Sequence, residues 1–443
     1  MLATLSSFSA LYLATLLMLT GNGLFNTSMG LLLTDRGVGQ IWVGMLIAAY
    51  YLGLVLGARL GHRLIIRVGH IRAYVACAAI ATTMALAQTL IDALAVWLAF
   101  RVVAGMAMVT QLMVIESWLN EQTENRQRGR VFSFYMVVSG LGTVLGQLAL
   151  LLFPVADLRP LVLVAICMAI CLVPIALTAR SHPAAQLPAP LDIPFFLKRV
   201  PMSLTALFLA GNLSGAFYGL APVFAAKQGL STAHVAMFVA AAVTAGLAAQ
   251  WPMGWLSDRL NRVGLIRANA LLLTVCMAPL WGWLQLPFWL LLVLSGLFGI
   301  LQFTLYPLGA AFANDHVEPE RRVGLAAVLI MVYGVGACIG PLVAGALMDL
   351  AGPGMFYVFA SACSLALAVF MRPGRVTGEH QVEEAPIHFV PAPDSLQSSP
   401  MAATLDPRAD PATDLYVETV PVDNSPVTET SDPASSDPQP PGP

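Results

Sequence analysis

Apolar residues in this chain gather in long unbroken runs instead of the short alternating stretches typical of half-buried strands. A helix needs about 20 apolar residues to cross the ~30 Å hydrocarbon layer of a bilayer. The runs cover residues 8–33, 40–58, 73–91, 93–119, 131–153, 160–179, 202–226, 232–256, 266–285, 287–312, 323–348 and 354–371. The strands of a membrane β-barrel alternate in polarity over about ten residues, which is not the pattern here. The sequence predicts an all-α integral membrane protein with twelve transmembrane helices.

Composition supports this prediction. Of 443 residues, 58% are hydrophobic and only 10% are charged, whereas soluble domains carry about 25% charged residues. A chain of this length with a mean hydropathy of +0.77 has too little polar surface to enclose a single water-surrounded core. A soluble globular protein is therefore excluded.

Basic residues lie almost entirely in alternate loops. One set of loops holds Arg59, Arg63, Arg67, Arg72, Arg126, Arg128, Arg130, Arg180, Lys198, Arg199, Arg259, Arg262, Arg267, Arg321, Arg322, Arg372 and Arg375. The opposite loops hold Arg36, Arg159 and Lys227. Basic loops stay in the cytoplasm, so both termini are predicted to be cytoplasmic in a multi-pass protein of a bacterial inner membrane.

Two segments outside the runs divide the chain. A proline-rich linker at 180–200 separates a predicted N-terminal six-helix bundle, residues 1–179, from a C-terminal bundle, residues 201–371. Residues 372–443 contain 14 prolines and carry a net charge of −9, against +7 for the preceding residues. Such a composition predicts a disordered cytoplasmic tail that either solvates the protein or binds a partner. The basic excess lies between apolar runs, which suits anionic membrane lipids and not nucleic acid.

The sequence offers little for an enzyme. All six cysteines lie inside apolar runs without a CxxC pair, so neither a metal nor another cofactor is expected. The seven histidines lie in loops, at helix ends or in the tail, and no paired catalytic groups share a face. No glycine-rich loop for the phosphates of ATP is present either.

A charged cassette occurs twice at equivalent places. "RVGHIRA" at 67–73 follows the second run, and "RVGLIRA" at 262–268 follows the eighth. "LTGN" at 19–22 in the first run has its counterpart in "LAGN" at 209–212 in the seventh. Two pseudo-symmetric six-helix repeats are the architecture of transporters in which one half rocks against the other.

Several motifs in the expected runs resemble those of the major facilitator superfamily (MFS). "GWLSDRLNR" at 254–262 is similar to its loop signature, with Asn261 in place of the last glycine, and "RVVAGMAMV" at 101–109 resembles its fourth-helix motif. "GVGACIGPLVAG" at 334–345 resembles its glycine–proline helix motif. "ESWLN" at 116–120 and "AAQWPMGWLSDRL" at 248–260 are similar to the YcaD-like branch of bacterial carriers. The resemblance covers about residues 8–371 and implies the MFS fold.

In that superfamily helices one, four, seven and ten line the substrate cavity. The polar residues of these runs, which are the substrate-cavity candidates, are Asn22, Asn26, Arg101, Asn212, Gln302 and Tyr306. For each amide the alternative is a hydrogen bond to a neighbouring helix, worth about 0.6 kcal/mol. A cation at the depth of Arg101 costs about 2.5 kcal/mol or more unless compensated, which favours a role in binding an anionic group or in proton coupling over snorkelling to the interface.

Four further residues are candidates for coupling or gating. Glu116 lies near the cytoplasmic end of its run, where it forms a gate with a loop arginine, carries a proton, or makes a structural ion pair. The resemblance implies that Asp258, beside Arg259, crosses to the start of run five near Arg130. The first half has "GARLGHRLII" at 57–66 without the equivalent aspartate, so this latch is expected in one half only.

The combined prediction is a monomeric secondary active transporter that moves a small solute by alternating access. Efflux of a drug-like compound or metabolite is the leading interpretation, with protons as a candidate coupling ion. The alternatives are a metabolite uptake carrier and a solute sensor of the same fold that does not transport.

Overall fold

The computed structural model describes residues 8–123, 128–177, 192–318, 321–371 and 399, and the regular structure in these ranges is helical. The first half comprises α2 (Ser9–Asp35), α3 (Gln40–Val68), α4 (His70–Leu90), α5 (Leu94–Glu121), α6 (Arg128–Ala149), η2 (Leu150–Leu152), α7 (Arg159–Ile170) and α8 (Leu172–Ala176). The short α9 (Ile193–Arg199) precedes the second half, which comprises α10 (Pro201–Lys227), α11 (Thr232–Ser257), α12 (Arg262–Cys276), η3 (Ala278–Trp281), α13 (Phe288–Phe303), α14 (Leu305–Asn314), α15 (Arg322–Ala351) and α16 (Met355–Phe370).

Each of the twelve apolar runs forms one helix or two consecutive helices. In the described part of the chain, ten helical segments are long and apolar enough to cross a membrane, and α16 is a shorter apolar helix. The remaining run forms α12 and η3. The predicted all-α membrane fold is confirmed. The disorder predicted for 372–443 falls, apart from Ser399, outside the described residues.

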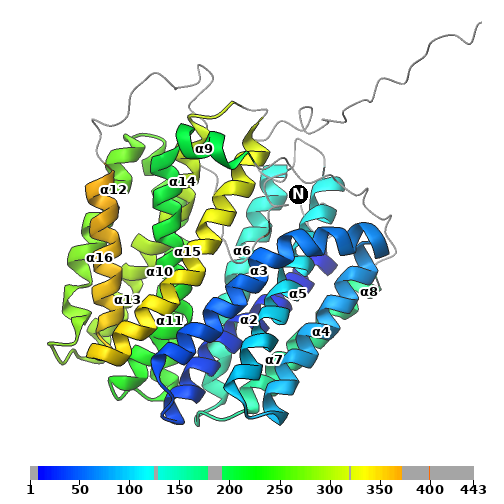
Figure 1. Cartoon of the computed structure of the whole chain (residues 1–443), viewed down its shortest axis with the longest axis horizontal. Helices are drawn as coiled ribbons and strands as arrows, with labels where there is room; N and C mark the ends of the chain where they lie inside the picture. Colours follow the sequence, from blue (N-terminus) through cyan, green and yellow to red (C-terminus); the bar gives the residue numbers. More distant parts are fainter. Residues whose placement is uncertain (1–7, 124–127, 178–191, 319–320, 372–398, 400–443) are drawn as a thin grey trace, which may run out of the picture.

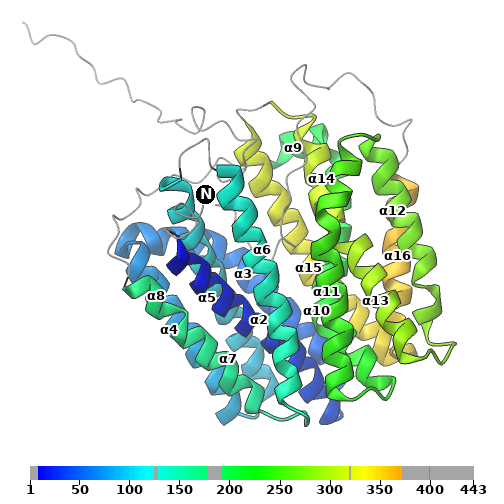
Figure 2. The same cartoon turned by 180° about the vertical axis from the view of Figure 1, so that it is seen from behind.

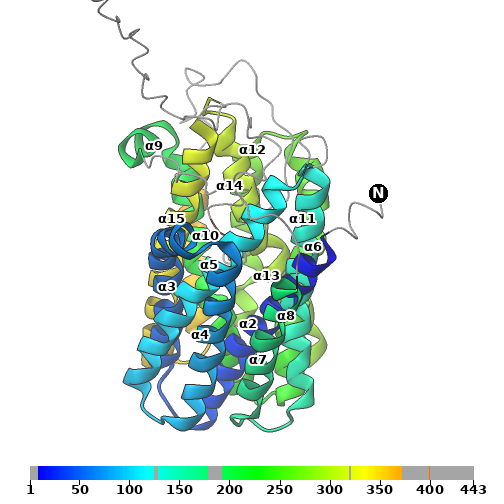
Figure 3. The same cartoon turned by 90° about the vertical axis from the view of Figure 1, so that its right-hand side faces the viewer.

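The helices pack as two groups that lie side by side (Figure 1). Within the first group α3 packs on α5 and α2 on α6; within the second, α10 packs on α15 and α11 on α13. Between the groups α3 contacts α15 and α10, α2 contacts α10, and α6 contacts α11, whose adjacency is visible from behind (Figure 2). The helix α9 lies across one end of the molecule (Figure 3). The domain boundaries at 179 and 201 stay a prediction.

Prolines explain why two runs form broken helices. The run at 160–179 is interrupted at Cys171, and the run at 287–312 is interrupted at Thr304. Pro174 and Pro307 follow these breaks by three residues. A proline has no N–H to donate to the carbonyl four residues earlier, and its ring clashes with that carbonyl. Gln302 and Tyr306, expected on one helix face, consequently lie on separate helices, α13 and α14.

The two copies of the cassette adopt different structures. In the first half α3 continues to Val68, and Gly69 alone, at φ +85°, turns the chain into α4. In the second half α11 ends at Ser257, and the second copy begins α12 at Arg262. Asn261, which replaces the motif's glycine, caps α12 by accepting hydrogen bonds from the amides of Val263 (2.9 Å) and Gly264 (3.3 Å). An asparagine at this position supplies a side-chain acceptor that glycine lacks.

The two halves pack backbone to backbone at the end that carries the α2–α3 loop. A Cβ on Gly44 of α3 would lie 2.2 Å from the carbonyl oxygen of Pro341 on α15, and a Cβ on Gly30 of α2 would lie 2.7 Å from that of Gly219 on α10. These distances are too short for any larger residue, so the glycines permit backbone-to-backbone packing. This junction joins the halves at the end that the arginine distribution places outside the cell.

Candidate functional site

Arg101 connects three helices of the first half. Its Nη2 donates to Oδ1 of Asn26 on α2 (2.5 Å), and its Nε donates to the carbonyl of Leu46 on α3 (3.3 Å). The guanidinium also lies 4.5 Å from the ring centroid of Phe25 and 4.6 Å from that of Tyr50. Cation–π contacts of this kind compensate a desolvated charge. Arg101 is only 1% exposed, so these groups replace the water that it has lost.

One nitrogen of the Arg101 guanidinium takes no part in these hydrogen bonds. Nη1 of Arg101 is buried and forms no hydrogen bond with the described residues. A guanidinium has five N–H donors in a fixed planar arrangement. The site therefore contains a preorganised donor whose partner would have to be an acceptor from outside the described residues.

Glu116 is fully buried further along α5. The hydroxyl of Tyr135, on α6, donates to Oε1 of Glu116 at 3.0 Å. The backbone N–H of Ser399 donates to Oε1 and Oε2 at 3.0 and 3.1 Å, and its hydroxyl also donates to Oε2. Glu116 is thus a hydrogen-bond acceptor in the interior of the first half.

In the second half the candidate amides join helices or bond to their own helix. Nε2 of Gln302 on α13 donates to the carbonyl of Ala210 (2.9 Å) and to Oγ of Ser214 (2.8 Å), both on α10. Nδ2 of Asn212 donates to the carbonyl of Phe208 one turn earlier on α10, at 2.8 Å. These contacts are the interhelical and intrahelical bonds that were the alternative to a role in substrate binding.

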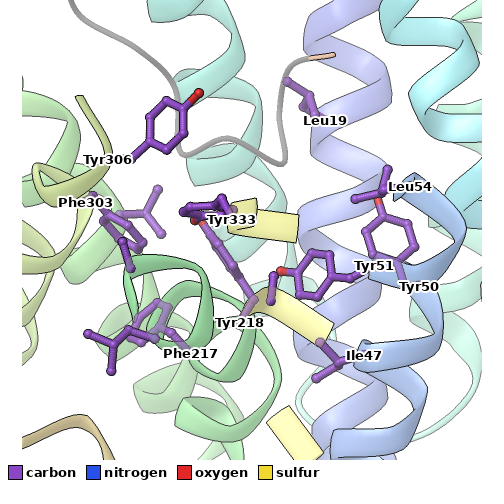
Figure 4. Close-up of a cluster of buried hydrophobic side chains, with 14 of the residues drawn as sticks. Leu19, Ile47, Tyr50, Tyr51, Leu54, Phe217, Tyr218, Phe303, Tyr306 and Tyr333 are labelled. Carbon is purple, nitrogen blue, oxygen red and sulfur yellow. The ribbon is translucent and has the colours of Figure 1, made fainter. Parts of the chain in front are cut away.

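Aromatic side chains from both halves meet between the bundles (Figure 4). Tyr51 extends from α3 toward Tyr218 of α10, whose ring stacks on Phe303 of α13 at 5.9 Å. The Tyr306 ring on α14 meets Tyr333 of α15 edge-on at 5.3 Å. Of this cluster, only Tyr306 was a candidate from sequence. Aromatic residues alone do not reveal which helix face they occupy, so the other members of the cluster could not be predicted from sequence.

The next three candidates occupy different places. Asn22 is half-buried on α2 beside Tyr50, and Arg130 is exposed near the start of α6. Arg259 stacks its guanidinium on the Trp255 ring, 3.7 Å from the centroid. Of all the cavity candidates, the structure brings Asn26 and Arg101 into direct contact.

Asp258 takes part in an ion-pair network at the end of the second half. Its Oδ1 accepts from Arg262 Nη2 at 3.3 Å, and Nη1 of Arg262 donates to Asp315 and to the carbonyl of Ala311. The network joins the α11–α12 loop to the end of α14. The crossing of Asp258 to the start of α6 stays a prediction.

The sequence profile of the Major Facilitator Superfamily matches residues 11–287 and 245–411. The chain belongs to this superfamily. Among curated relatives, "Uncharacterized MFS-type transporter Ent638_1421" of Enterobacter sp. (strain 638) is 29% identical over 387 residues, which cover 86% of this chain and 98% of the relative. The MFS-type transporter YcaD of Escherichia coli O139:H28 is 28% identical over 379 residues, covering 82% of this chain and 94% of YcaD. These matches confirm the YcaD-like resemblance.

Solved structures show the same fold at low identity. The nucleoside transporter NupG matches with a TM-score of 0.72 at 14% identity, over 83% of this chain and 99% of NupG. A bacterial homologue of the human lysosomal transporter Spinster, in an inward-facing and occupied conformation, matches with a TM-score of 0.67 at 15% identity, over 83% and 94% of the two chains. A D-xylose–proton symporter matches with a TM-score of 0.66 at 14% identity, over 89% and 99%. These structures show the MFS fold, and the family model and the curated relatives named as transporters indicate a membrane transporter and not an enzyme.

Sequence reasoning missed one further contact of this MFS chain. Asp349, at the end of α15, accepts hydrogen bonds from the amides of Gln40 (2.7 Å) and Ile41 (2.8 Å) at the start of α3. Helix N-termini present unpaired N–H groups and a partial positive charge, which a carboxylate satisfies. The contact links the two halves beside the glycine junction. Asp349 is the one acidic residue of α15 and directly follows the apolar run at 323–348, which is a signal, but its partner cannot be read from the sequence.

Proposed function

We propose that this MFS protein is a secondary active carrier that moves a small solute across the bacterial inner membrane by alternating access. The close packing of the halves at the end with the α2–α3 loop supports the proposal. There, Asp349 caps α3, and Gly30 and Gly44 pack against the backbone of the opposite half. An exposed carboxylate and small residues make a junction that separates without leaving large apolar groups unpaired, as a rocking mechanism requires.

The orientation of this junction follows from the distribution of basic loops. The α2–α3 loop holds Arg36 alone, whereas the loops at the opposite end hold most of the arginines. The positive-inside rule therefore assigns the closed end to the periplasm and both termini to the cytoplasm. With this orientation, we propose that the described conformation is inward-facing, and the Spinster homologue of similar fold has an inward-facing structure.

The chemistry between the halves favours a drug-like solute or metabolite with an aromatic or apolar body and an acceptor group. Tyr51, Tyr218 and Tyr333 supply ring faces from both bundles, and Nη1 of Arg101 supplies a donor. Apolar compounds enter a bilayer without a carrier, so active removal is the direction that benefits from a protein. Efflux is the transport direction that we propose.

Uptake coupled to protons is the second candidate function. The D-xylose–proton symporter shares the fold, and Glu116 is a buried carboxylate that a proton can neutralise. In either direction, a carboxylate on the path of a solute allows protonation to change the affinity of the site for donor groups.

Flux measurements test both functions. Purified protein is first screened by thermal shift against a library of metabolites and antibacterial compounds, and radiolabelled hits are then assayed in proteoliposomes with an imposed pH gradient. A carrier moves the hit, and everted vesicles report the direction. A hit that binds with a micromolar Kd but shows no flux or counterflow would identify a sensor and refute the proposal.

A further inference from the structure

The contact at Glu116 connects two regions that are far apart in the chain. Ser399 lies 28 residues beyond Met371, which directly follows α16, yet it is fully buried. Its N–H lies 3.0 and 3.1 Å from the two oxygens of Glu116, and its hydroxyl donates to the same carboxylate. A single tail residue therefore donates to one buried acceptor through both its backbone and its side chain.

Glu116 requires donors of this kind. An ionised carboxylate that is removed from water is unfavourable unless hydrogen bonds replace its hydration. Tyr135 supplies one donor from α6, and Ser399 supplies two more. Pro400 follows Ser399 and favours an extended conformation for it, while the N–H of Ser399 itself remains available.

The length of the tail is compatible with this contact. The 28 residues from Met371 to Ser399 span at most about 90–100 Å when extended, which is several times the thickness of the hydrocarbon layer. The helix α16 belongs to the second half and Glu116 belongs to the first. The hydrogen bonds of Ser399 therefore connect a residue that follows the second half in the sequence to a buried carboxylate of the first half.

We propose that Ser399 of the C-terminal tail is a built-in ligand of the Glu116 site. The carboxylate binds paired N–H and O–H donors, and Ser399 occupies it in the conformation described here. Bound in this way, Ser399 competes with protons or solute donors for Glu116. This consequence for transport rests on the proposed function, whereas the docking itself does not.

Hydrogen exchange of the full-length protein in nanodiscs tests the docking. The Ser399 amide should exchange at least about tenfold more slowly in the parent than in Glu116→Ala, since a hydrogen bond to a carboxylate is lost. Gln111→Ala is the matched control, because Gln111 is a fully buried polar residue on the same helix whose described contacts do not include Ser399. Equal exchange of the Ser399 amide in the parent and in Glu116→Ala would overturn the proposal.

A second measurement leaves the helix bundle unchanged. Dicyclohexylcarbodiimide, an apolar carboxyl reagent, is added to full-length variants, and its adduct at Glu116 is followed by mass spectrometry. Ser399→Pro removes both donors and should accelerate the modification about tenfold, with a smaller increase for Ser399→Ala, which keeps the N–H. Ser425→Pro is the control, since Ser425 also precedes a proline in the tail. Identical rates in the parent and Ser399→Pro would contradict the docking, whatever the flux assays show.

Discussion

The two halves of this MFS protein place their buried charges differently. The first half holds Arg101 and Glu116 within α5, at 1% and 0% exposure. In the second half the buried charged residues Arg262 and Arg322 lie at the starts of α12 and α15. Its inner polar groups are neutral, and Gln302 and Asn269 bond neighbouring helices.

This difference predicts different roles for the two halves. Charged groups inside a membrane protein are unfavourable, and they mark sites that bind substrates or ions, relay protons or form gates. Neutral amides stabilise helix packing through hydrogen bonds between helices. We therefore expect proton chemistry and the polar recognition of a solute to belong to the first half. The second half is expected to contribute aromatic ring faces and helix packing.

Replacing Arg101 should produce the largest effect. Arg101→Ala removes the donors to Asn26 and Leu46, at about 1.5–3 kcal/mol for each bond from a charged group, and it should abolish flux and lower the melting temperature. Arg101→Lys should restore little, because an ammonium cannot reproduce the planar arrangement of donors. Proteoliposome flux and thermal unfolding check both variants. Full flux in the alanine variant would show that the charge in the first half is structural only.

Disrupting the junction beside the α2–α3 loop should have an intermediate effect. Asp349→Ala removes the cap of α3, which is worth about 0.5–2 kcal/mol, so the inward-facing population should fall about fivefold relative to the outward-facing one. Double electron–electron resonance measures the distance between spin labels at Asp35 and Lys227, which are exposed on the two halves, and reports this change. Asp157→Ala is the control, because Asp157 bonds Arg159 within the first half. An unchanged distance distribution would show that the glycine contacts alone hold this end closed.

Replacing Gln302, a buried neutral residue of the second half, should have a smaller effect. Gln302→Leu keeps the volume of the side chain but removes two bonds to α10, which lowers the free energy of unfolding by about 1 kcal/mol. Flux should stay within about twofold of the parent, since the amide holds helices together and is not expected to touch the solute. If Gln302→Leu stopped transport while remaining folded, the division between the halves would be wrong.

The sequence predicted the fold well because the bilayer imposes a simple constraint on helix length. The predicted run at 73–91 and α4, His70–Leu90, differ by three residues or fewer at each end. Pro174 and Pro307 did not suffice to predict the breaks at Cys171 and Thr304, because a proline within a membrane helix does not always interrupt the helix. Pro222 and Pro341 lie inside unbroken helices.

The site was less predictable because it depends on which residues meet. Arg101 and Asn26 were recognised from their types and depth, and they do meet. The Asp349 cap and the Ser399 contact join residues more than 280 positions apart, and no local pattern encodes such pairs. The repeated cassette does not predict local structure either. Its first residues, Arg-Val, end α3 in the first half and begin α12 in the second.

The smallest expected effect concerns Asp258, the acidic residue that the first half lacks. In the described conformation Asp258 bonds Arg262, which is also held by Asp315 and a carbonyl, so Asp258→Asn should change stability by about 0.5 kcal/mol or less. If Asp258 crosses to the start of α6 when the cytoplasmic end closes, a contact worth about 0.3–1 kcal/mol is lost in that state alone. The inward-facing population should then rise about twofold, opposite in sign to Asp349→Ala, because a contact shifts populations only by its differential energy. Labels at Arg67 and Leu260, exposed on the two halves, measure the distance across that end. Unchanged distances together with normal flux would limit the role of the second cassette to its topological signal and the local Arg262 network.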